Sequence, residues 1–577
     1  MERRVLLAIF LSFLVIYIWQ GVFFKPAPKS VSGSATSAAA TEPGKVTPAP
    51  AAPAAVQAAQ ERAVAKQASS IVGESSERDI RVETTEVIAV FTNRGGRLKS
   101  WRLKSYRDAQ GEPLELVAQN LPDSQPRPFS LRVPDADVTD RLNQALYSVS
   151  GAPSSSPQTT PVQLRFEYED NSGLRVTKDF QLEPDSFVLS FASTVKIAGK
   201  ALTPTVQWGP GLGDTEETSR SAQPPGGLFS AQGSEQRLTP AAIVKQPGYQ
   251  GSYEFVGVDD HYFVTMALNT GAATVTFDSW TVPQPPESKA PAHTLVGYSI
   301  DLPPGDQPVK FYVGPKDFDR LASVGPNLTR AINFGWFTVI VVPLLRSLKW
   351  INGYVGNYGW SILALTAIIN LIILPLRHKS VVSMRKMQEI QPEAKAIQDR
   401  YAKLKATDPA KQKMNQELME LYRARGVNPA GGCVPMLLPF PILFAFYSLL
   451  SKAIELRGAP FMLWIHDLSK PDPYYVTPIL MGLSQLWQQW IAPATGVDPI
   501  QRRMMMVMPV VFTFLFITYP SGVALYWLAS NLWAIGQQYG TNYVIGPPNI
   551  RNVRPAAERR VKRVGSGKTD AAAAQES

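Results

Sequence analysis

The 577-residue sequence is poor in the residues that build metal centres and disulfide bonds. It has one cysteine, Cys433, and four histidines that lie far apart along the chain. One cysteine cannot form an intramolecular disulfide, and these spacings provide no cluster of metal ligands. The GxxxxGK[ST], GxSxG and HExxH motifs are also missing. A P-loop ATPase, a serine esterase and a zinc metalloprotease therefore have no support, and we expect no catalytic residue, no metal and no cofactor.

Apolar residues are abundant but unevenly distributed. They make up 45% of the chain, and the long apolar runs lie in residues 1–24 and 334–545. Between these regions the sequence resembles first a polar linker and then an ordinary globular domain. Because a run of about 20 apolar residues can span a bilayer, the distribution predicts a polytopic α-helical membrane protein with a large water-soluble insertion.

The N-terminal region predicts an anchor followed by a linker. Residues 1–24 form an apolar run that could span a bilayer, and Arg3 and Arg4 precede it. A cleaved signal peptide is the alternative, but the run exceeds the usual apolar core and no small-x-small site follows it directly. We therefore expect an uncleaved transmembrane anchor with a cytoplasmic N-terminus. Residues 25–79, rich in Ala, Pro and Ser, are expected to form a disordered linker.

From about residue 80 the hydrophobic pattern has a period of two. Alternate residues from Val162 to Tyr168 are apolar, and Asn171-Ser172-Gly173 follows them before the alternation resumes at Leu174. This pattern predicts a β-hairpin. Similar short segments continue to about residue 315. We expect an antiparallel sandwich over residues 80–320, exported because it follows an anchor whose N-terminus is inside.

The rest of the chain is helical and apolar. Phe334 to Leu345 is too short to span a bilayer and contains Pro343, so residues 325–355 are predicted to form an amphipathic helix at the membrane surface. A second transmembrane helix is predicted at 359–376, and helices three to six lie within 433–545. Their expected bounds are 433–453, 476–493, 504–519 and 521–543. With the anchor, six transmembrane helices are expected.

The positive-inside rule gives the topology. Between Arg377 and Arg425 there are 12 Lys/Arg and 6 Asp/Glu residues, whereas loop 455–475 has 2 basic and 3 acidic residues. The first loop is therefore expected to be cytoplasmic and the second external. The tail, 546–577, is basic and is also placed in the cytoplasm.

The cytoplasmic loop, 377–430, is predicted to be a helical hairpin. Thr407-Asp408-Pro409 separates two helical patterns as a helix N-cap followed by proline at the first helical position. The first pattern has an apolar stripe with spacings of three and four, made by Met387, Ile390, Ala394, Ile397, Tyr401 and Leu404. The hairpin either only connects two spans or forms a docking surface for a ribosome, a targeting factor or the substrate; its length and charge favour docking.

Uncharged polar residues occur inside the predicted spans. Thr366 and Asn370 lie four residues apart, and glutamines and asparagines mark the fourth and sixth spans. A polar group facing lipid costs a few kcal/mol, so these groups either hold helices together or line a wet groove. Met505 and Met508, at the start of the fifth span, form either an adaptable substrate surface or lipid-facing filler.

Several segments closely resemble the YidC membrane-protein insertase family. The resemblance covers nearly the whole chain in order, except the linker and the extreme C-terminus. It rests on Asn428 to Pro435 (NPAGGCVP), Phe461 to Leu468 (FMLWIHDL), Asp472 to Tyr475 (DPYY), Tyr519 to Trp527 (YPSGVALYW), Asn93 to Gly96 (NRGG), His261 to Phe263 (HYF) and Tyr312 to Pro315 (YVGP).

The resemblance implies a five-helix insertase core and a periplasmic β-supersandwich of the Gram-negative members. It implies insertion of nascent membrane proteins into the bacterial inner membrane, alone or with the Sec translocon, through a hydrophilic groove and without ATP hydrolysis. Ribosome or targeting-factor contacts would use the cytoplasmic hairpin and the basic tail, and the phospholipid bilayer would surround the core.

The family's site residues carry over one by one. The resemblance places Thr366 and Trp527 in the groove with Tyr526 beside them, and it places on the substrate-contact helix Cys433, Pro435, Phe440 and Pro441. One position departs from the family, because Asn370 replaces an intramembrane arginine. Arg377 lies seven positions further on, on the same side of an ideal helix and about 10 Å nearer the cytoplasm. Arg377 either supplies part of the missing charge or is only a positive-inside anchor.

Two other functions compete with the insertase hypothesis. A polytopic transporter with a periplasmic binding domain would usually have internal repeats, and this sequence shows none. A sugar-processing enzyme would need a catalytic histidine and acid pair in the β-domain, where His261 and His293 are the only histidines. That hypothesis has only fold analogy behind it.

Overall fold

A computed structural model of the chain describes residues 70–108, 110–119, 125–153, 157–212, 223–282, 293–303, 307–401, 409–426, 439–491 and 499–546. The predicted anchor at 1–24, most of the linker and nearly all of the basic tail lie outside these residues. The linker was predicted to extend to residue 79, and this boundary is wrong. Strand β1 (Ser70–Val72) already pairs with β8 (Val162–Asp170), because its backbone completes the edge of the sheet beside that strand.

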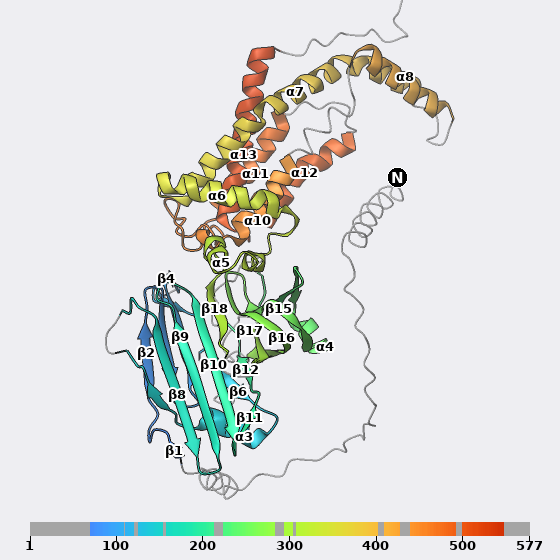
Figure 1. Cartoon of the computed structure of the whole chain (residues 1–577). Coiled ribbons are helices and arrows are strands. Elements are labelled where there is room, and N and C mark those ends of the chain that lie inside the picture. Colours follow the sequence, from blue (N-terminus) through green and yellow to red (C-terminus); the bar gives the residue numbers. More distant parts are fainter. Residues whose placement is uncertain are drawn as a thin grey trace, which may run out of the picture. The chain divides into compact units, whose positions relative to one another are not determined.

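The β-domain consists of two antiparallel sheets (Figure 1). The smaller has four strands in the order β2-β3-β4-β5. The larger has 14 strands, and its main path runs β1-β8-β9-β10-β18-β16-β15-β13-β14. The remaining bounds are β2 Asp79–Glu83, β3 Val87–Thr92, β4 Arg97–Arg107, β5 Pro113–Glu115, β6 Ser130–Arg132, β7 Ser148–Ser150, β9 Leu174–Leu182, β10 Val188–Ile197, β11 Lys200–Leu202, β12 Thr205–Trp208, β13 Gly226–Ala231, β14 Ser234–Leu238, β15 Gly248–Asp259, β16 Phe263–Val282, β17 His293–Asp301 and β18 Val309–Pro315.

The predicted hairpin is confirmed. Strands β8 and β9 pair antiparallel in the register Val162↔Leu182 to Glu169↔Arg175, and their side chains alternate between buried and more exposed. Gly173 turns the chain with φ +83°, a conformation that glycine adopts without a steric penalty. The local sequence therefore determines both the strands and the turn.

An aromatic cluster fills the core of the β-domain. Phe129 is fully buried, and its ring centroid lies within 6 Å of four other aromatic rings, those of Phe180, Phe191, Trp208 and Phe311. Each such pair adds about 0.5–1.5 kcal/mol beyond area burial. Two short helices, α3 (Ala136–Gln144) and α4 (Pro240–Lys245), complete the domain.

The region predicted as one interfacial helix, 325–355, begins differently. After α5 (Phe318–Val324) the chain forms two short 3-10 turns, η1 (Leu328–Ala331) and η2 (Gly335–Phe337), and α6 covers only Thr338–Val355. Gly335 at φ +68° interrupts the helix. Helix α6 has apolar side chains on both its buried and its exposed side, which differs from the single apolar face of the predicted amphipathic helix: Val341, Leu345 and Leu348 are buried, and Val339, Trp350 and Tyr354 are exposed.

The second predicted span does not end at residue 376. Helix α7 runs without a break from Tyr358 to Arg400, through Pro375 and Pro392. A proline removes one backbone donor, and the flanking residues here still form a helix. At 1.5 Å per residue α7 is about 65 Å long, roughly twice a hydrocarbon core. Its first half can span a membrane and its second half forms one arm of the predicted hairpin.

The remaining helices are α8 (Ala410–Ala424), α10 (Pro439–Lys452), η4 (Ile454–Leu456), α11 (Val476–Ile491), α12 (Pro499–Phe516) and α13 (Ser521–Ile545). Two predicted boundaries change. Pro409 is the N-cap of α8 instead of its first helical residue, and it makes no side-chain capping bond. Helix α12 begins at Pro499, five residues before the predicted span, because the polar residues before Met504 continue the helix.

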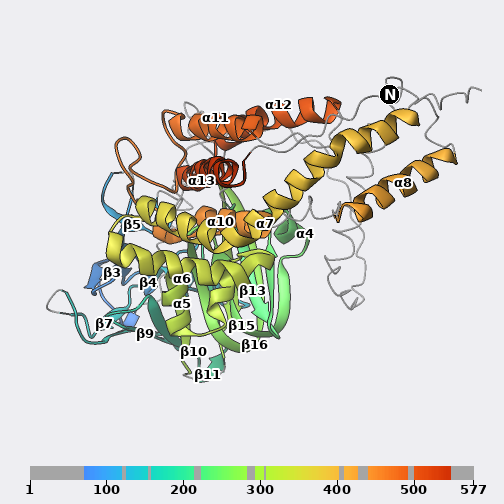
Figure 2. The same cartoon turned by 90° about the horizontal axis from the view of Figure 1, so that it is seen from above.

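Among the described residues, one helical segment, Tyr358–His378, is long and apolar enough to cross a membrane; Pro441–Lys452 and Met506–Phe516 are shorter apolar segments. Figures 1 and 2 show α8 beside the far end of α7. The Tyr401 hydroxyl donates to Glu417 of α8 (2.7 Å), and Arg400 of α7 forms an ion pair with the same carboxylate (2.9 Å). The predicted hairpin is therefore a packed unit.

Candidate functional site

The polar residues of α7 lie on its buried side. Thr366 and Asn370 are 2% and 5% exposed. The Thr366 hydroxyl donates to the Ile362 carbonyl (2.6 Å), and the Asn370 amide donates to the Thr366 carbonyl (2.8 Å). Both polar groups are thus satisfied one turn back in their own helix. They keep this face of α7 polar without placing a charge there.

Arg377 and Tyr526, two of the predicted groove residues, come within range of an electrostatic interaction. Arg377 is half-buried on α7, close enough to the Tyr526 hydroxyl of α13 for the two groups to interact electrostatically. The Tyr526 ring is buried and stacks on Phe446 of α10, with centroids 4.2 Å apart and planes 7° from parallel. Tyr526 therefore links α7, α10 and α13.

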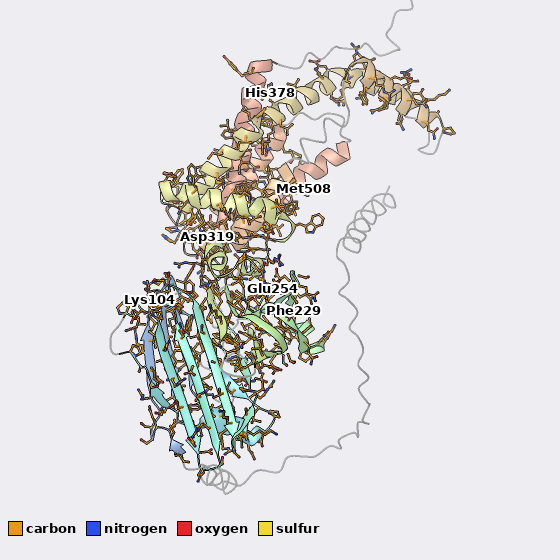
Figure 3. The ribbon with its side chains drawn as sticks, in the orientation of Figure 1. Lys104, Phe229, Glu254, Asp319, His378 and Met508 are labelled. Carbon is orange, nitrogen blue, oxygen red and sulfur yellow. The ribbon has the colours of Figure 1, made fainter. Side chains whose placement is uncertain are left out.

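Trp527 points to a different neighbour from Tyr526. Its ring contacts Phe512 and Phe516 of α12, at centroid distances of 5.4 and 4.9 Å. Met508 lies on α12 as well (Figure 3), and it is 48% exposed. Trp527 thus joins the last two helices, while Met508 presents its thioether outward, where it can contact lipid or a substrate helix.

A cavity of about 660 Å³ lies between α7 and α13. Its lining is mostly apolar and includes Leu363, Ala367, Leu528 and Leu532. Of the five predicted groove residues, only Thr366 is among its lining residues. This cavity is therefore an apolar crevice beside the polar face of α7, and it does not coincide with the predicted hydrophilic groove.

Some polar residues of the later helices hold helices together. Asn531 of α13 is buried, and its amide donates to Ser484 (3.0 Å) and to the Met481 carbonyl (3.3 Å) of α11. The side-chain oxygens of Gln485 and Gln537 are buried without a hydrogen-bond partner among the described residues. Helix association therefore explains Asn531, but not the two glutamine oxygens.

Several predicted substrate-contact residues cannot be placed. Cys433 and Pro435 lie outside the described residues, and the side chains of Phe440 and Met505 do as well. Pro441 is exposed at the start of α10. Sequence reasoning missed Phe446, because one phenylalanine in an apolar helix carries no signal that it will stack on Tyr526.

A β-sandwich joined to apolar helices, one of them long and apolar enough to cross a membrane, is the architecture of a membrane protein with a large folded β-domain. The chain belongs to the YidC family of membrane protein insertases. Residues 350–546 match the family model described as 60Kd inner membrane protein, and residues 79–347 match the YidC periplasmic domain. The resemblance found in the sequence is confirmed, and the β-sandwich is the family's periplasmic domain.

Relatives match over nearly the full length. The membrane protein insertase YidC of Syntrophus aciditrophicus is 33% identical, covering 94% of this chain and 99% of the relative. That of Geobacter metallireducens is 34% identical, covering 93% and 98%. A crystal structure described as an active YidC insertase with its first transmembrane domain resolved is 20% identical over 85% of this chain and 98% of that one, with a TM-score of 0.33, too low for a structural comparison.

Proposed function

We propose that this protein inserts and folds integral membrane proteins into the bacterial inner membrane, alone or with the Sec translocon, and without ATP hydrolysis or other catalysis. The observation that carries the proposal is the match to insertases over both the β-domain and the helices. In this proposal the multi-pass core has five helices, preceded by the N-terminal anchor, with both termini in the cytoplasm. Nascent chains enter from the cytoplasm, where ribosomes or targeting factors contact the hairpin.

The proposed groove uses the polar side of α7 and the neighbouring face of α13. Thr366, Asn370 and Tyr526 would lower the cost of moving a polar segment into the membrane, because they offer hydrogen-bonding groups where lipid offers none. In the proposal the substrate helix then contacts α10 and α12, where Pro441 and Met508 are exposed.

Depletion tests the proposal directly. When the protein is depleted from its native host, membrane insertion of a small two-span substrate should fall, measured by protease accessibility of its external loop. Restoring the full chain should restore insertion, and a soluble exported protein serves as the control. Normal insertion of several such substrates after depletion would contradict the insertase function.

Arg377 is proposed to replace the cation that Asn370 does not supply. The guanidinium beside Tyr526 at the cytoplasmic end of the polar face would attract acidic residues of an entering segment. Replacement Arg377→Ala should reduce insertion of a substrate with acidic residues in its translocated segment by about tenfold, the effect of roughly 1.4 kcal/mol. A matched substrate without acidic residues should be affected much less.

Two further variants distinguish this role from membrane anchoring. Arg377→Lys should restore insertion of the acidic substrate, because it keeps the charge. Lys379→Ala, two residues along the same helix, removes an equal charge from the same loop. If Arg377→Ala and Lys379→Ala have equal and mild effects on both substrates, Arg377 is only a positive-inside anchor.

A further inference from the structure

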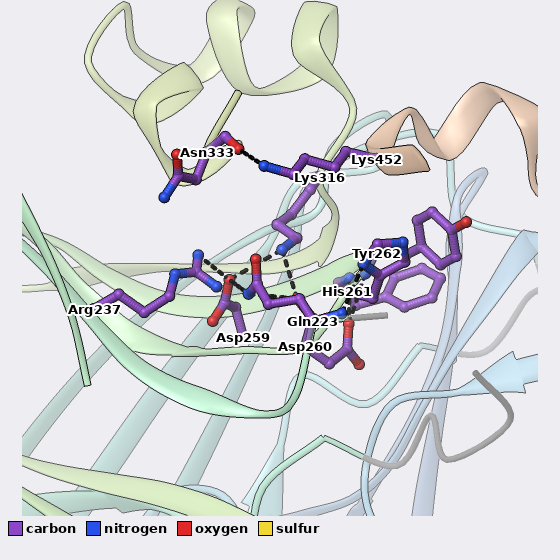
Figure 4. Close-up of polar contacts among 10 residues, drawn as sticks. Gln223, Arg237, Asp259, Asp260, His261, Tyr262, Lys316, Asn333 and Lys452 are labelled. Atoms are coloured by element: carbon purple, nitrogen blue, oxygen red, sulfur yellow. Dashed lines mark hydrogen bonds and ion pairs between the residues drawn. The ribbon is translucent and has the colours of Figure 1, made fainter. Parts of the chain in front are cut away.

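One contact between the β-domain and the external end of α10 is made by a histidine. His261 lies in the turn between β15 and β16, and only 7% of it is exposed. Its Nδ1 accepts a hydrogen bond from the Gln223 backbone N–H (3.0 Å; Figure 4). Its Nε2 lies 2.8 Å from the Ser451 carbonyl in the last turn of α10. Both ring nitrogens are therefore engaged, one inside the β-domain and one across the junction.

These two contacts determine the protonation state of His261. Because Nδ1 accepts from an N–H group, the neutral ring carries its hydrogen on Nε2 and donates it to Ser451. A second proton would have to sit on Nδ1, facing the Gln223 N–H. Protonation thus replaces this hydrogen bond with two N–H groups that point at each other, that of Nδ1 and that of Gln223. The ring must then move.

Cations surround the imidazole. Lys316, at the end of β18, is 4% exposed and donates to Asp259 (3.0 Å) and to the Asp260 carbonyl (2.5 Å). Lys452 of α10 donates to the Asn333 carbonyl, and the Arg457 guanidinium after η4 lies over the rings of Tyr262 and Phe263, 5.6 and 4.9 Å from their centroids. Each of these elements presents positive charge to His261.

The nearby carboxylates do not offset this charge at the ring. Asp259 is fully buried and pairs with both Arg237 (2.5 Å) and Lys316. Asp260 accepts from the backbone N–H groups of Tyr262 and Phe263, and Glu235 faces Arg237. Burial, and then the charges of Lys316, Lys452 and Arg457, lower the pKa of His261 to about 4 from its ordinary 6.5.

We propose that His261 is an acid-sensitive positioning residue: neutral, it holds the β-domain on the external end of α10, and protonated, it releases that contact. A second contact limits the movement. Lys349 of α6 bridges Asp319 (2.5 Å) beside α5 and Glu455 (3.2 Å) after α10. Release of His261 therefore loosens the junction and does not separate the two parts.

Hydrogen exchange of the full-length protein in lipid nanodiscs tests the proposal. The reporters are the Tyr262 and Phe263 amides, which donate to Asp260 in the same turn that carries His261. If the released imidazole regains its ordinary pKa of 6.5, linkage predicts that their opening constant, corrected for intrinsic exchange rates, rises roughly 70-fold between pH 7.5 and 4.5. Peptides from β8 and β9 should change less than threefold, because they lie away from the junction.

Variants separate His261 from other groups. His261→Gln keeps an amide donor near Ser451 but cannot titrate, so its pH response should be less than threefold, whereas His261→Arg should be open at both pH values. His466→Gln, at an exposed histidine of the external loop, should respond like the unmodified protein.

Glu455 is the competing source of acid sensitivity, because burial raises its pKa. Glu455→Gln should keep the 70-fold response if His261 is the sensor. Loss of the response in Glu455→Gln, its survival in His261→Gln, or its absence in the unmodified protein would each overturn the proposal.

Discussion

Replacing residues 384–425 with a short Gly/Ser linker should abolish insertion without loss of the protein from the membrane. The hairpin has no catalytic group, but it is a folded unit. Besides the bonds of Glu417, Arg425, the C-cap residue of α8, pairs with Glu393 of α7 (2.7 Å), and Ile390 and Leu418 are 6% and 8% exposed. A loop that only joined two helices would not need to pack in this way. Complementation of a depleted host, with the protein level measured by immunoblot, checks the result.

A second hairpin variant tests whether the positive charge of the hairpin is needed in addition to its packed structure. Lys413→Gln with Arg423→Gln lowers the charge of the exposed side and leaves the bonds between α7 and α8 in place. The loop from Arg377 to Arg425 has 12 basic and 6 acidic residues, a balance that suits acidic or RNA-bearing partners. A partial loss of complementation by this variant would indicate that a partner binds the hairpin through its basic side chains. Normal complementation by the linker variant would show that the hairpin is a passive connector.

Lys178→Met should strongly destabilise the β-domain. Lys178 is completely buried in β9, and its ammonium donates to the carbonyls of Gly95 (2.6 Å), Phe129 (2.8 Å) and Gly96 (3.3 Å). Burial, followed by the charge of Arg97, holds the pKa of Lys178 well below its usual value. Methionine keeps much of the apolar stem but leaves these carbonyls without the ammonium donor.

The expected loss follows from those carbonyls. Each buried polar group left without a partner costs about 1–3 kcal/mol, whereas removing a buried charge recovers part of that cost. We therefore expect the free energy of unfolding of the β-domain to fall by about 2–4 kcal/mol. Hydrogen exchange of β8 and β9 in the full-length protein should then speed up by roughly 30- to 700-fold. Lys196→Met, at an exposed lysine of β10, is the control and should change exchange little. Equal effects of the two variants would contradict the structural role of Lys178.

The sequence correctly predicted elements whose structure depends on neighbouring residues alone. The alternation from Val162 to Tyr168 and the glycine at 173 identified the β8–β9 hairpin, because strand period and turn geometry are properties of neighbouring residues. The same reasoning failed at α7. The second span was predicted to end at residue 376, where the apolar run ends, but α7 continues through Pro375 and Pro392 to Arg400.

The candidate site was only partly predictable. Thr366, Asn370 and Arg377 follow from the helical period and from the resemblance, and the structure places them along α7. That Tyr526 would interact electrostatically with Arg377 and stack on Phe446 could not be derived, because these residues come from three helices. Helix packing depends on the shapes of whole faces, and the hydrophobic period of each helix does not specify which residues will meet.

The sequence by itself determined the family, the division into a β-domain and apolar helices, and the absence of a disulfide. Composition, periodicity and motifs can be recognised in a sequence without knowing which residues contact one another. Only the tertiary structure decided that His261 meets Ser451, 190 residues further along the chain, and that Lys178 is buried among backbone carbonyls. Both contacts join segments that the chain brings together only when its hydrophobic core forms, so no local pattern could have revealed them.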